Sequence, residues 1–392
     1  MDLFSRCRRF KAAHNLKAAG CYPYFHSIES AQEPEVVVDG RRMIMIGSNN
    51  YLGLTTHPKV KEAALLAIEH YGTGCGGSRF LNGTQDLHEQ VERKLAKFKG
   101  REAALIFTTG FQTNLGILSA LCGKGDTLIT DRWDHASIVD GCRLSFGKTL
   151  RFRHNDMADL ERVLNRAGDG GKLIVVDGVF SMEGDIANVP EIIRLARKYG
   201  ARVMVDDAHA TGVLGKNGRG TGEHFGLEEE VDLIMGTCSK ALASVGGFVA
   251  AKAEVIDYIQ HHARSLIFSA SLPPPCVAAI SAALDVIESE PERRQQLRAN
   301  GERMRRELSA LGFNTGLSET PIVPVILGQD QLAFQFWKLA WEEGIFSNPA
   351  VPPAVPKGRA LIRTSYMATH TSSQLDRVLE AFHKVGKRLG VI

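Results

Sequence analysis

Residues 173–206 have the sequence LIVVDGVFSMEGDIANVPEIIRLARKYGARVMVD, in which two short apolar runs flank a helical pattern. The runs Leu173–Asp177 and Arg202–Asp206 are rich in β-branched and aliphatic residues, which favours strands buried on both faces. Between them, Pro190 suits the first turn of a helix and Gly200 suits its C-terminal stop. This strand–helix–strand pattern predicts an α/β fold with a mostly parallel sheet.

Apolar runs of the same kind occur four more times on either side of this stretch. Each has four or five residues and is bounded by polar residues or Gly, and they are Ala103–Phe107, Thr127–Thr130, Val231–Met235 and Gly247–Ala251. Helical segments lie between several of the runs. The six runs together therefore predict one large sheet with helices on both faces.

The last third of the chain has a different pattern, which begins where Ser269–Pro275 interrupts the preceding one. We expect a loop in the Pro-rich segment Asn348–Gly358 (NPAVPPAVPKG), because Pro has no backbone N–H for a central strand. The other expected elements are helices at 277–288, 290–311, 331–343 and 372–389 and strands at 321–327 and 361–365. The predicted organisation is an N-terminal arm (1–55), a large domain (56–270) and a smaller α+β C-terminal domain (271–392).

The composition excludes several classes of protein. Of the 392 residues, 44% are hydrophobic and 23% are charged, so the chain has enough apolar surface to fold. The 47 basic and 44 acidic residues leave a net charge of +3, which indicates no basic domain for nucleic acid. The sequence has no run of about 18 apolar residues, so no transmembrane helix is predicted. Seven Cys without a CxxC pair, and charges where a signal peptide needs an apolar core, predict a cytoplasmic protein.

The segment Gly236–Gly247 (GTCSKALASVGG) places one Lys among small residues, directly after a predicted buried strand. A Lys held out of water loses part of its preference for the charged form, which suits it to form a Schiff base with an aldehyde. The small neighbours of Lys240 leave room for a flat ring. The alternative is a surface Lys on a Gly-rich turn, and the segment alone favours neither.

Other polar motifs also follow the ends of predicted strands. Asp206 could keep a pyridinium nitrogen protonated, or it could cap the next helix. Asp206 and His209 could ligate a metal, but no third ligand lies nearby, and no metal is predicted. Thr108–Asn114 (TTGFQTN) precedes a helix, whose start favours a phosphate, although helix capping alone explains it. His135 could stack on an aromatic ring, but a lone His is more often structural.

Two further residues complete the set of candidates. Ser181 could bond a ring hydroxyl or cap a turn. Arg363 lies in an expected strand, and its guanidinium could clamp a carboxylate or form a surface salt bridge. Each feature alone permits a structural explanation. A Lys, an Asp, a His and a phosphate-binding turn at the ends of successive buried strands together indicate a pyridoxal phosphate (PLP) site.

At these residues the sequence resembles the α-oxoamine synthases, a family within the fold-type I PLP enzymes. The likeness extends from Ser48–Leu54 (SNNYLGL) to Met367–Thr371 (MATHT), which is nearly the whole chain. It implies a fold-type I PLP-dependent transferase with pyridoxal 5'-phosphate as cofactor. It also implies a homodimer whose active sites are shared between the subunits.

The resemblance assigns roles to individual residues. Lys240 would form the Schiff base with the cofactor, Asp206 would pair with the pyridine nitrogen, and His209 would pair with the ring 3-hydroxyl. His135 would stack on the ring and help to orient the substrate carboxylate. These four residues are the predicted catalytic set. The other residues expected to contact the cofactor are Gly110, Phe111, Ser181, Thr237 and Ser239.

The resemblance also predicts the substrates, an amino acid and an acyl-CoA. Arg363 would bind the amino-acid carboxylate, with Asn49 near it. Ala270 stands where sister enzymes often have a Thr that contacts the phosphate of the neighbouring subunit, and Ser269 or Ser271 could replace that contact. The stretches closest to family members that condense L-serine with palmitoyl-CoA, giving 3-ketodihydrosphingosine, CoA and CO₂, are Gly20–Phe25, Tyr71–Thr84, Gly236–Ser244 and Pro352–Pro356.

Three alternative functions remain open at this point. The first is a glycine- or alanine-using synthase of the same family with a shorter acyl-CoA. The second is a related transaminase or lyase, and the third is a binding or scaffold protein on an inherited fold. Because a sphingoid product is lipid-like, transient membrane contact is also expected to be possible.

Overall fold

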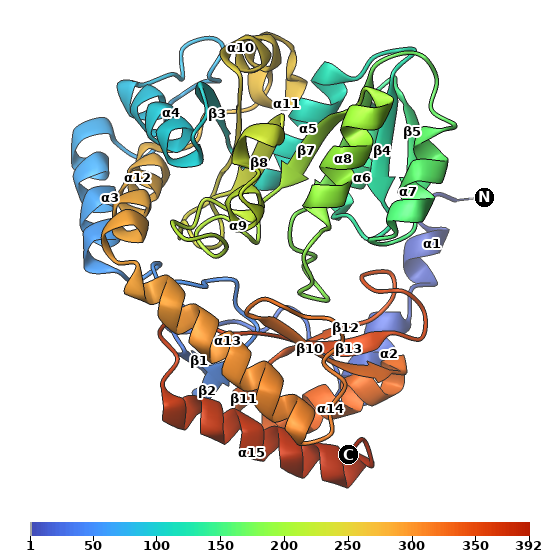
Figure 1. The fold of residues 1–392 in the computed structure, drawn as a ribbon. Coiled ribbons are helices and arrows are strands. Elements are labelled where there is room, and N and C mark those ends of the chain that lie inside the picture. Colours follow the sequence, from blue (N-terminus) through green and yellow to red (C-terminus); the bar gives the residue numbers. More distant parts are fainter. Residues whose placement is uncertain (1) are drawn as a thin grey trace. The chain divides into compact units, whose positions relative to one another are not determined.

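Seven strands form the principal sheet of the structure, a computed structural model that describes residues 2–392 (Figure 1). The strand order is β3-β9-β8-β7-β6-β4-β5, and four of the six pairings are parallel. The mostly parallel sheet is therefore confirmed. The strands are β3 (Ala103–Phe107), β4 (Thr127–Asp131), β5 (Lys148–Phe152), β6 (Lys172–Asp177), β7 (Arg202–Asp206), β8 (Leu233–Thr237) and β9 (Gly247–Ala251).

Two of these strands differ from the sequence-based expectation. β8 begins and ends two residues later than predicted, so that Thr237 belongs to the strand. β5 was not predicted, because its residues KTLRF are largely polar and only partly buried. β5 lies at the edge of the sheet, where exposed charged side chains are common because they protect the unpaired edge.

The direction of the strands determines where the site can form. β3 and β8 are both antiparallel to β9, and β8, β7, β6 and β4 run parallel to one another. β5 is also parallel to β4, so six strands point the same way, and their carboxyl ends lie at one edge of the sheet. This is the edge at which open α/β sheets bind ligands.

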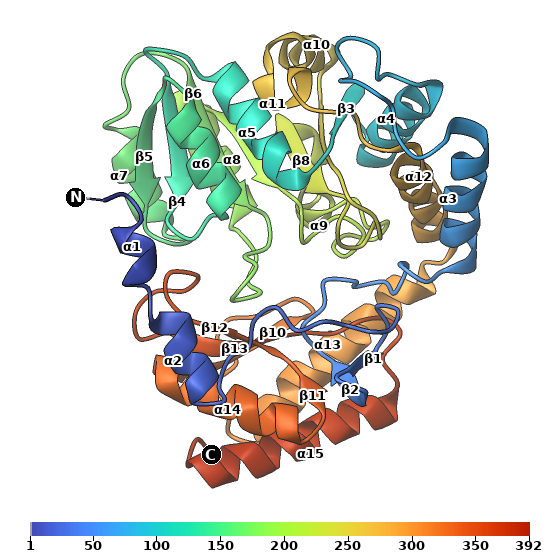
Figure 2. The ribbon, with the colours of Figure 1, turned by 180° about the vertical axis from the view of Figure 1, so that it is seen from behind.

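Helices cover both faces of this sheet (Figures 1 and 2). One apolar core joins one face to α5 (Gly110–Leu121), α6 (Ala136–Leu144), α10 (Ala253–His262) and α11 (Arg264–Ile267). A second core joins the other face to α7 (Met157–Leu164) and α8 (Val189–Tyr199). The predicted α8 helix is confirmed, and Gly200 ends it in the left-handed conformation with φ +62°. The remaining helices of this part of the chain are α3 (Pro58–Tyr71), α4 (Asp86–Lys99), α9 (Thr221–Phe225) and α12 (Pro274–Ser289).

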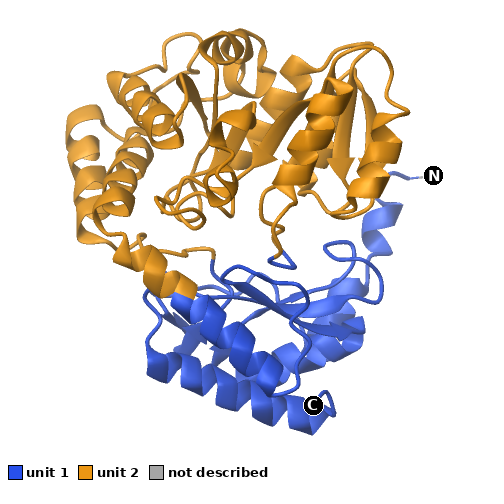
Figure 3. Ribbon diagram, in the orientation of Figure 1, with its two compact units in different colours: residues 1–48, 182–184, 299–392 blue, residues 49–181, 185–298 orange. Residues whose placement is uncertain are grey.

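The contacts within the chain define two units (Figure 3). The larger unit comprises residues 49–181 and 185–298 and contains the principal sheet. The smaller unit comprises residues up to 48, residues 182–184 and residues 299–392. The two units are groups of residues that contact one another, whereas the predicted boundaries at 55/56 and 270/271 separate domains. These domain boundaries therefore stay predictions. α13 (Glu292–Ala310) begins in the larger unit and ends in the smaller one.

The smaller unit contains two three-stranded sheets. One has the order β1-β2-β11 and the other the order β10-β13-β12. The strands are β1 (Glu35–Val38), β2 (Arg41–Met45), β10 (Ile322–Gly328), β11 (Ile345–Phe346), β12 (Asn348–Ala350) and β13 (Ala360–Ser365). The helices that this unit adds are α1 (Ser5–Arg8), α2 (Ala12–Ala18), α14 (Asp330–Glu342) and α15 (Ser372–Leu389).

The expectation that Asn348–Gly358 is entirely a loop is wrong, because its first three residues form β12. β12 pairs with β13 alone, so it lies at an edge of its sheet, where Pro349 does not interrupt a central ladder. The predicted helix at 372–389 is confirmed as α15, which Thr371 and Gln374 begin with a capping box. Among residues 2–392, no helix combines the length and the apolar character that a membrane span needs.

Candidate active site

The loops that follow the carboxyl ends of β3, β4, β6, β7 and β8 enclose a pocket of about 320 Å³. All of the residues that line it belong to the larger unit. The pocket brings together nine of the eleven residues predicted from the sequence, although they are spread over 131 positions of the chain. They are Gly110, Phe111, His135, Ser181, Asp206, His209, Thr237, Ser239 and Lys240.

Lys240 enters the pocket from the turn after β8. It is half-buried, and it is the one lysine among the described residues that line the pocket. The turn is held by hydrogen bonds from Thr237 Oγ1 to the Gly246 carbonyl at 3.0 Å and from the Ser244 N–H to the Cys238 carbonyl at 3.0 Å. The backbone around Lys240 is therefore well fixed, which is what a positioned amine requires.

Asp206 is the last residue of β7, and its carboxylate is buried. Its Oδ1 accepts a hydrogen bond from the Ala208 N–H at 2.9 Å, and its Oδ2 accepts one from Asn114 Nδ2 at 2.8 Å. Hydrogen bonds of this kind favour the ionised form of a carboxyl group. Asn114 was not predicted as a site residue, because an Asn at the start of a predicted helix has no distinguishing pattern of its own.

The ring of His135 is oriented by Ser137. Nδ1 of His135 accepts a hydrogen bond from the Ser137 N–H at 3.2 Å and lies 2.7 Å from Ser137 Oγ. A neutral His135 therefore carries its proton on Nε2. Burial lowers the pKa of His135; the charge of Asp206 opposes this effect and the charge of Lys240 adds to it. Both observations favour a neutral imidazole that can donate from Nε2.

His209 is buried and lies beside Tyr51. The Tyr51 hydroxyl and His209 Nδ1 are hydrogen-bonded at 2.7 Å. The same hydroxyl lies 3.4 Å from Asn49 Oδ1, so Asn49 reaches His209 through one intervening side chain. Tyr51 was missed at the sequence level, although it belongs to the stretch SNNYLGL that carried the family resemblance.

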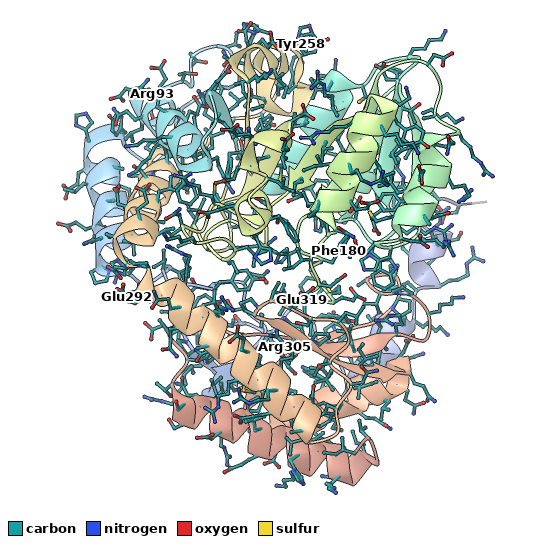
Figure 4. All side chains as sticks on the ribbon, in the orientation of Figure 1. Arg93, Phe180, Tyr258, Glu292, Arg305 and Glu319 are labelled. Carbon is teal, nitrogen blue, oxygen red and sulfur yellow. The ribbon has the colours of Figure 1, made fainter. Side chains whose placement is uncertain are left out.

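Asp177 is a further pocket residue that was missed. It is the last residue of β6, and its Oδ2 accepts a hydrogen bond from the His135 N–H at 3.1 Å. Burial raises the pKa of Asp177 well above the ordinary value, and the nearby charge of Asp206 adds to the effect. Through the hydrogen bond to the His135 N–H, Asp177 supports the loop of His135 from the neighbouring strand. The loop after Asp177 leads through Phe180, which is labelled in Figure 4, to Ser181.

Two glycines at the start of α5 and of β9 have no space for a side chain. A Cβ at Gly110, the first residue of α5, would lie 2.7 Å from Thr237 Oγ1. A Cβ at Gly247 would lie 2.6 Å from the Cα of Gly110. The N-terminal turn of α5 lines the pocket at Gly110 and Phe111, directly after Thr109, whose hydroxyl caps the helix by accepting a hydrogen bond from the Gln112 N–H. The start of a helix favours an anion at this place.

A model of the family described as aminotransferase class I and II matches residues 41–382. The chain belongs to this family. A serine palmitoyltransferase from Sphingobacterium spiritivorum is 50% identical over 387 residues, which cover 98% of this chain and 97% of that protein. An 8-amino-7-oxononanoate synthase from Thermoanaerobacter pseudethanolicus is 48% identical over 379 residues, which cover 96% of each. A high-resolution structure of SPT with a PLP internal aldimine matches with a TM-score of 0.97 and 39% identity over 100% of both chains.

The predicted resemblance to the α-oxoamine synthases, and the fold-type I architecture that it implies, are therefore confirmed for this member of the aminotransferase class I and II family. The residues that line the pocket fit a phosphorylated ring aldehyde. Lys240 could react with the aldehyde through its amine, the Asp206 carboxylate could pair with a ring nitrogen, and the first turn of α5 could bind a phosphate.

The remaining two predicted residues lie elsewhere. Asn49 does not line the pocket and is linked to it through Tyr51. Arg363 is buried in β13 of the smaller unit, where its Nη1 donates a hydrogen bond to Ser365 Oγ at 3.2 Å. The roles assigned to the site residues, including that of Arg363, remain predictions. Near Ala270, the Ser269 hydroxyl accepts a hydrogen bond from Gln112 Nε2 at 3.0 Å.

Proposed function

We propose that this chain is a PLP-dependent acyltransferase that condenses L-serine with palmitoyl-CoA and releases 3-ketodihydrosphingosine, CoA and CO₂. A bond forms between the amino-acid Cα and the acyl carbonyl carbon, and the thioester C–S bond and the Cα–carboxyl bond break. One observation carries the proposal. A lysine, a hydrogen-bonded aspartate and two histidines line one pocket in a chain that is 50% identical, over 98% of its length, to a serine palmitoyltransferase.

The residues present fit PLP as the cofactor. PLP, when bound, supplies an aldehyde for the Lys240 amine and an electron-withdrawing ring for the substrate Cα. Asp206 would hold the ring nitrogen, and the two groups that donate hydrogen bonds to its carboxylate fix its position for this purpose. His209 and Ser181 would bond the ring hydroxyl. The phosphate would lie at the first turn of α5, with Thr237 and Ser239 beside it.

The side chains of this chain then bind the amino acid and move its proton. The Lys240 amine is the base that takes the proton from Cα, because it is the one amine among the described pocket residues. His135, with its proton on Nε2, can donate a hydrogen bond to the substrate carboxylate. Arg363 would bind the same carboxylate through its planar guanidinium, with Asn49 near it.

A second candidate uses glycine or alanine with a shorter acyl-CoA. The observation in its favour is the 48% identity to an 8-amino-7-oxononanoate synthase over 96% of both chains. The residues predicted to bind the cofactor are expected to be the same in both cases. The two functions therefore differ in the substrates that the loaded enzyme accepts.

CoA release from the PLP-loaded protein tests the proposal. The panel pairs serine, glycine or alanine with acyl-CoAs of increasing chain length. We expect release with serine and palmitoyl-CoA to exceed release with every other pair. A visible spectrum that responds to glycine or alanine but not to serine supports the second candidate instead. Pyruvate-dependent return of the amine form of the cofactor, without CoA release, indicates a transaminase.

We infer that the protein is a cytoplasmic homodimer with active sites shared between its subunits, as the family resemblance implies. Light scattering after gel filtration measures the state of assembly. A mass near 43 kDa in the PLP-loaded protein contradicts the dimer. Mixing a Lys240→Ala chain with an Arg363→Ala chain tests the sharing of sites, because activity regained in the mixture requires residues from both subunits.

A further inference from the structure

The turn that follows β5 leaves the sheet at the same edge as two loops of the pocket, but does not line the pocket itself. β5 ends at Phe152 and α7 begins after its cap Asp156, so the turn comprises residues 153–155. β5 pairs in parallel with β4, and β4 pairs in parallel with β6 (Figure 1). The loop after β4 carries His135 and the loop after β6 carries Ser181, and both of these residues line the pocket.

Aromatic side chains of both loops pack on His154, in the middle of this turn. Trp133 stacks on the His154 ring with the centroids 3.7 Å apart and the planes 17° apart. Phe180 meets the same ring edge to face, with the centroids 4.4 Å apart and the planes at 88°. Trp133 precedes His135 by two positions, and Phe180 directly precedes Ser181. His154 therefore contacts a close neighbour of each of the two site residues.

The Asp131 carboxylate, at the end of β4, connects the turn to the loop of His135. Its Oδ1 accepts a hydrogen bond from the Trp133 N–H at 2.8 Å and is also hydrogen-bonded to His154 Nδ1. Its Oδ2 accepts a hydrogen bond from the Asn155 N–H at 2.7 Å. The turn thus holds the carboxylate that orients the first residues of the loop leading to His135.

Three side-chain hydrogen bonds connect the turn to the loop after β6. Nδ2 of Asn155 donates to the Ile186 carbonyl at 3.0 Å, and Oδ1 of Asn155 accepts from the Asn188 N–H at 3.0 Å. The third bond joins His154 Nε2 to the Asp185 carboxylate. The turn therefore binds both loops through side chains of two consecutive residues.

The backbone of Asn155 has an uncommon conformation. Its φ is +49°, in the left-handed region that residues with a Cβ seldom adopt. Such conformations persist where the surrounding bonds over-determine them, and they cluster at functional sites. Here the strained residue is one that bonds to both loops of the pocket, which favours a role in their placement.

We propose that His154 and Asn155 are positioning residues, which hold the loops of His135 and Ser181 at the separation that bound PLP requires. They act from a third strand, without contact to the cofactor. Such support matters because a displacement of about 1 Å at a site can cost about 100-fold in rate. The proposal rests on the cofactor contacts proposed for His135 and Ser181, but not on the choice of amino acid or acyl-CoA.

Asn155→Gly tests the link to the loop after β6. Glycine adopts a positive φ readily, so this change removes the two side-chain hydrogen bonds and keeps the turn. Hydrogen–deuterium exchange of the PLP-loaded protein should become about fivefold faster in residues 178–188, the effect of about one neutral hydrogen bond. Exchange in residues 132–135 should not change, because the backbone N–H of residue 155 still binds Asp131. Equilibrium binding of PLP should weaken about fivefold for the same reason.

The matched control is Asp39→Gly, which should change neither the exchange of the loops nor the binding of PLP. Asp39 also has a left-handed backbone, with φ +50°, but it lies exposed between β1 and β2 of the smaller unit. A comparable effect of Asp39→Gly means that the loss does not depend on the turn after β5, and it overturns the proposal.

His154→Gln tests the link to both loops at once. Because the ring contacts Trp133 and Phe180, its loss should accelerate exchange in residues 132–135 and 178–188 together. Acceleration that appears while the buried amides of residues 203–205 in β7 remain protected is local. Loops that exchange only together with β7 indicate global unfolding, and this result contradicts a positioning role.

The binding of PLP decides between a positioning role and a merely structural one. Unchanged exchange, or faster exchange with unchanged PLP binding, in the Asn155→Gly protein overturns the proposal. His135→Ala separates this failure from failure of the proposed cofactor site. Unchanged PLP binding and an unchanged visible spectrum in His135→Ala contradict the cofactor contact of His135. An effect of His135→Ala, with none of Asn155→Gly or His154→Gln, contradicts the positioning role alone.

Discussion

The side-chain amide of Asn114 donates a hydrogen bond to the Asp206 carboxylate over 2.8 Å. The same nitrogen lies 2.8 Å from Ser137 Oγ, and Ser137 in turn orients the ring of His135. A single amide on α5 thus links the residue expected to hold the ring nitrogen with the residue expected to stack on the ring. Asn114, Ser137 and Asp206 are all buried, and hydrogen bonds are stronger in buried surroundings than in water.

Replacing Asn114 by Leu should lower kcat about 10- to 100-fold, the cost of one hydrogen bond to a charged group. The reason is that Asp206 loses a donor that fixes the position of its carboxylate, and Ser137 loses its partner. Steady-state CoA release measures kcat and KM, and the Tm measures stability. Asn165→Leu, at an exposed position after α7, is the matched control. A fall in Tm without a fall in kcat indicates that Asn114 has a structural role only.

Lys240→Ala should remove both CoA release and the visible absorbance of the Schiff base, since no other lysine among the described residues lines the pocket. Lys216→Ala, at an exposed position, should change neither. Absorbance and CoA release that both survive Lys240→Ala contradict the assignment of Lys240. Dialysis against free PLP before the measurement excludes a simple loss of cofactor.

The positions of the main site residues could be predicted because of the fold. Buried strands of a parallel sheet are continuous apolar runs, and the polar residue that ends each run marks the edge where ligands bind. Asp206 ends β7, and His135 and Lys240 closely follow the ends of β4 and β8. The strand order was not needed to bring them together, because six of the seven strands run in the same direction.

Other residues could not be predicted for equally physical reasons. Asn114 is 92 positions from Asp206, and only the packing of α5 on the sheet places the two side chains in contact. Asp177 resembles an ordinary strand end until its neighbours are known. β5 was missed because an edge strand with one buried residue in five lacks the apolar run that indicates a strand.

Lys99 is a buried lysine outside the pocket, and we expect it to stabilise the fold. Its Nζ donates hydrogen bonds to Thr211 Oγ1 at 2.8 Å and to the Arg219 carbonyl at 2.5 Å, and lies 3.4 Å from Asp207 Oδ2. Lys99→Met should lower the free energy of unfolding by about 3–5 kcal/mol, because it leaves the Asp207 charge buried without its partner.

Urea unfolding measures this loss, and Lys97→Met, at an exposed position of the same helix, is the control. Adding Asp207→Asn to Lys99→Met should cost less than the sum of the two single changes, because the second change removes the unpaired charge. Losses that simply add would show that the two groups do not interact.

His154 lies between two carboxylates, and its charge should make stability depend on pH. Its Nδ1 is 3.2 Å from Asp131 Oδ1, and its Nε2 is 3.0 Å from Asp185 Oδ2. Its ring also stacks on Trp133 with centroids 3.7 Å apart. Burial alone lowers the pKa of His154, but the two carboxylates outweigh this effect and raise the pKa to about 9.

Because the pKa is higher in the folded than in the unfolded state, His154 stabilises the fold fully below the unfolded pKa of about 6.5 and loses this contribution as the pH rises through about 9. His154→Gln should therefore lower the free energy of unfolding by up to about 3 kcal/mol at pH ~6, and by much less at pH ~10. Urea unfolding over this range measures the difference. His261→Gln, at a half-exposed histidine of α10, is the matched control for the loss of an imidazole. A loss in His154→Gln that is equal at both ends of the range contradicts a charged His154.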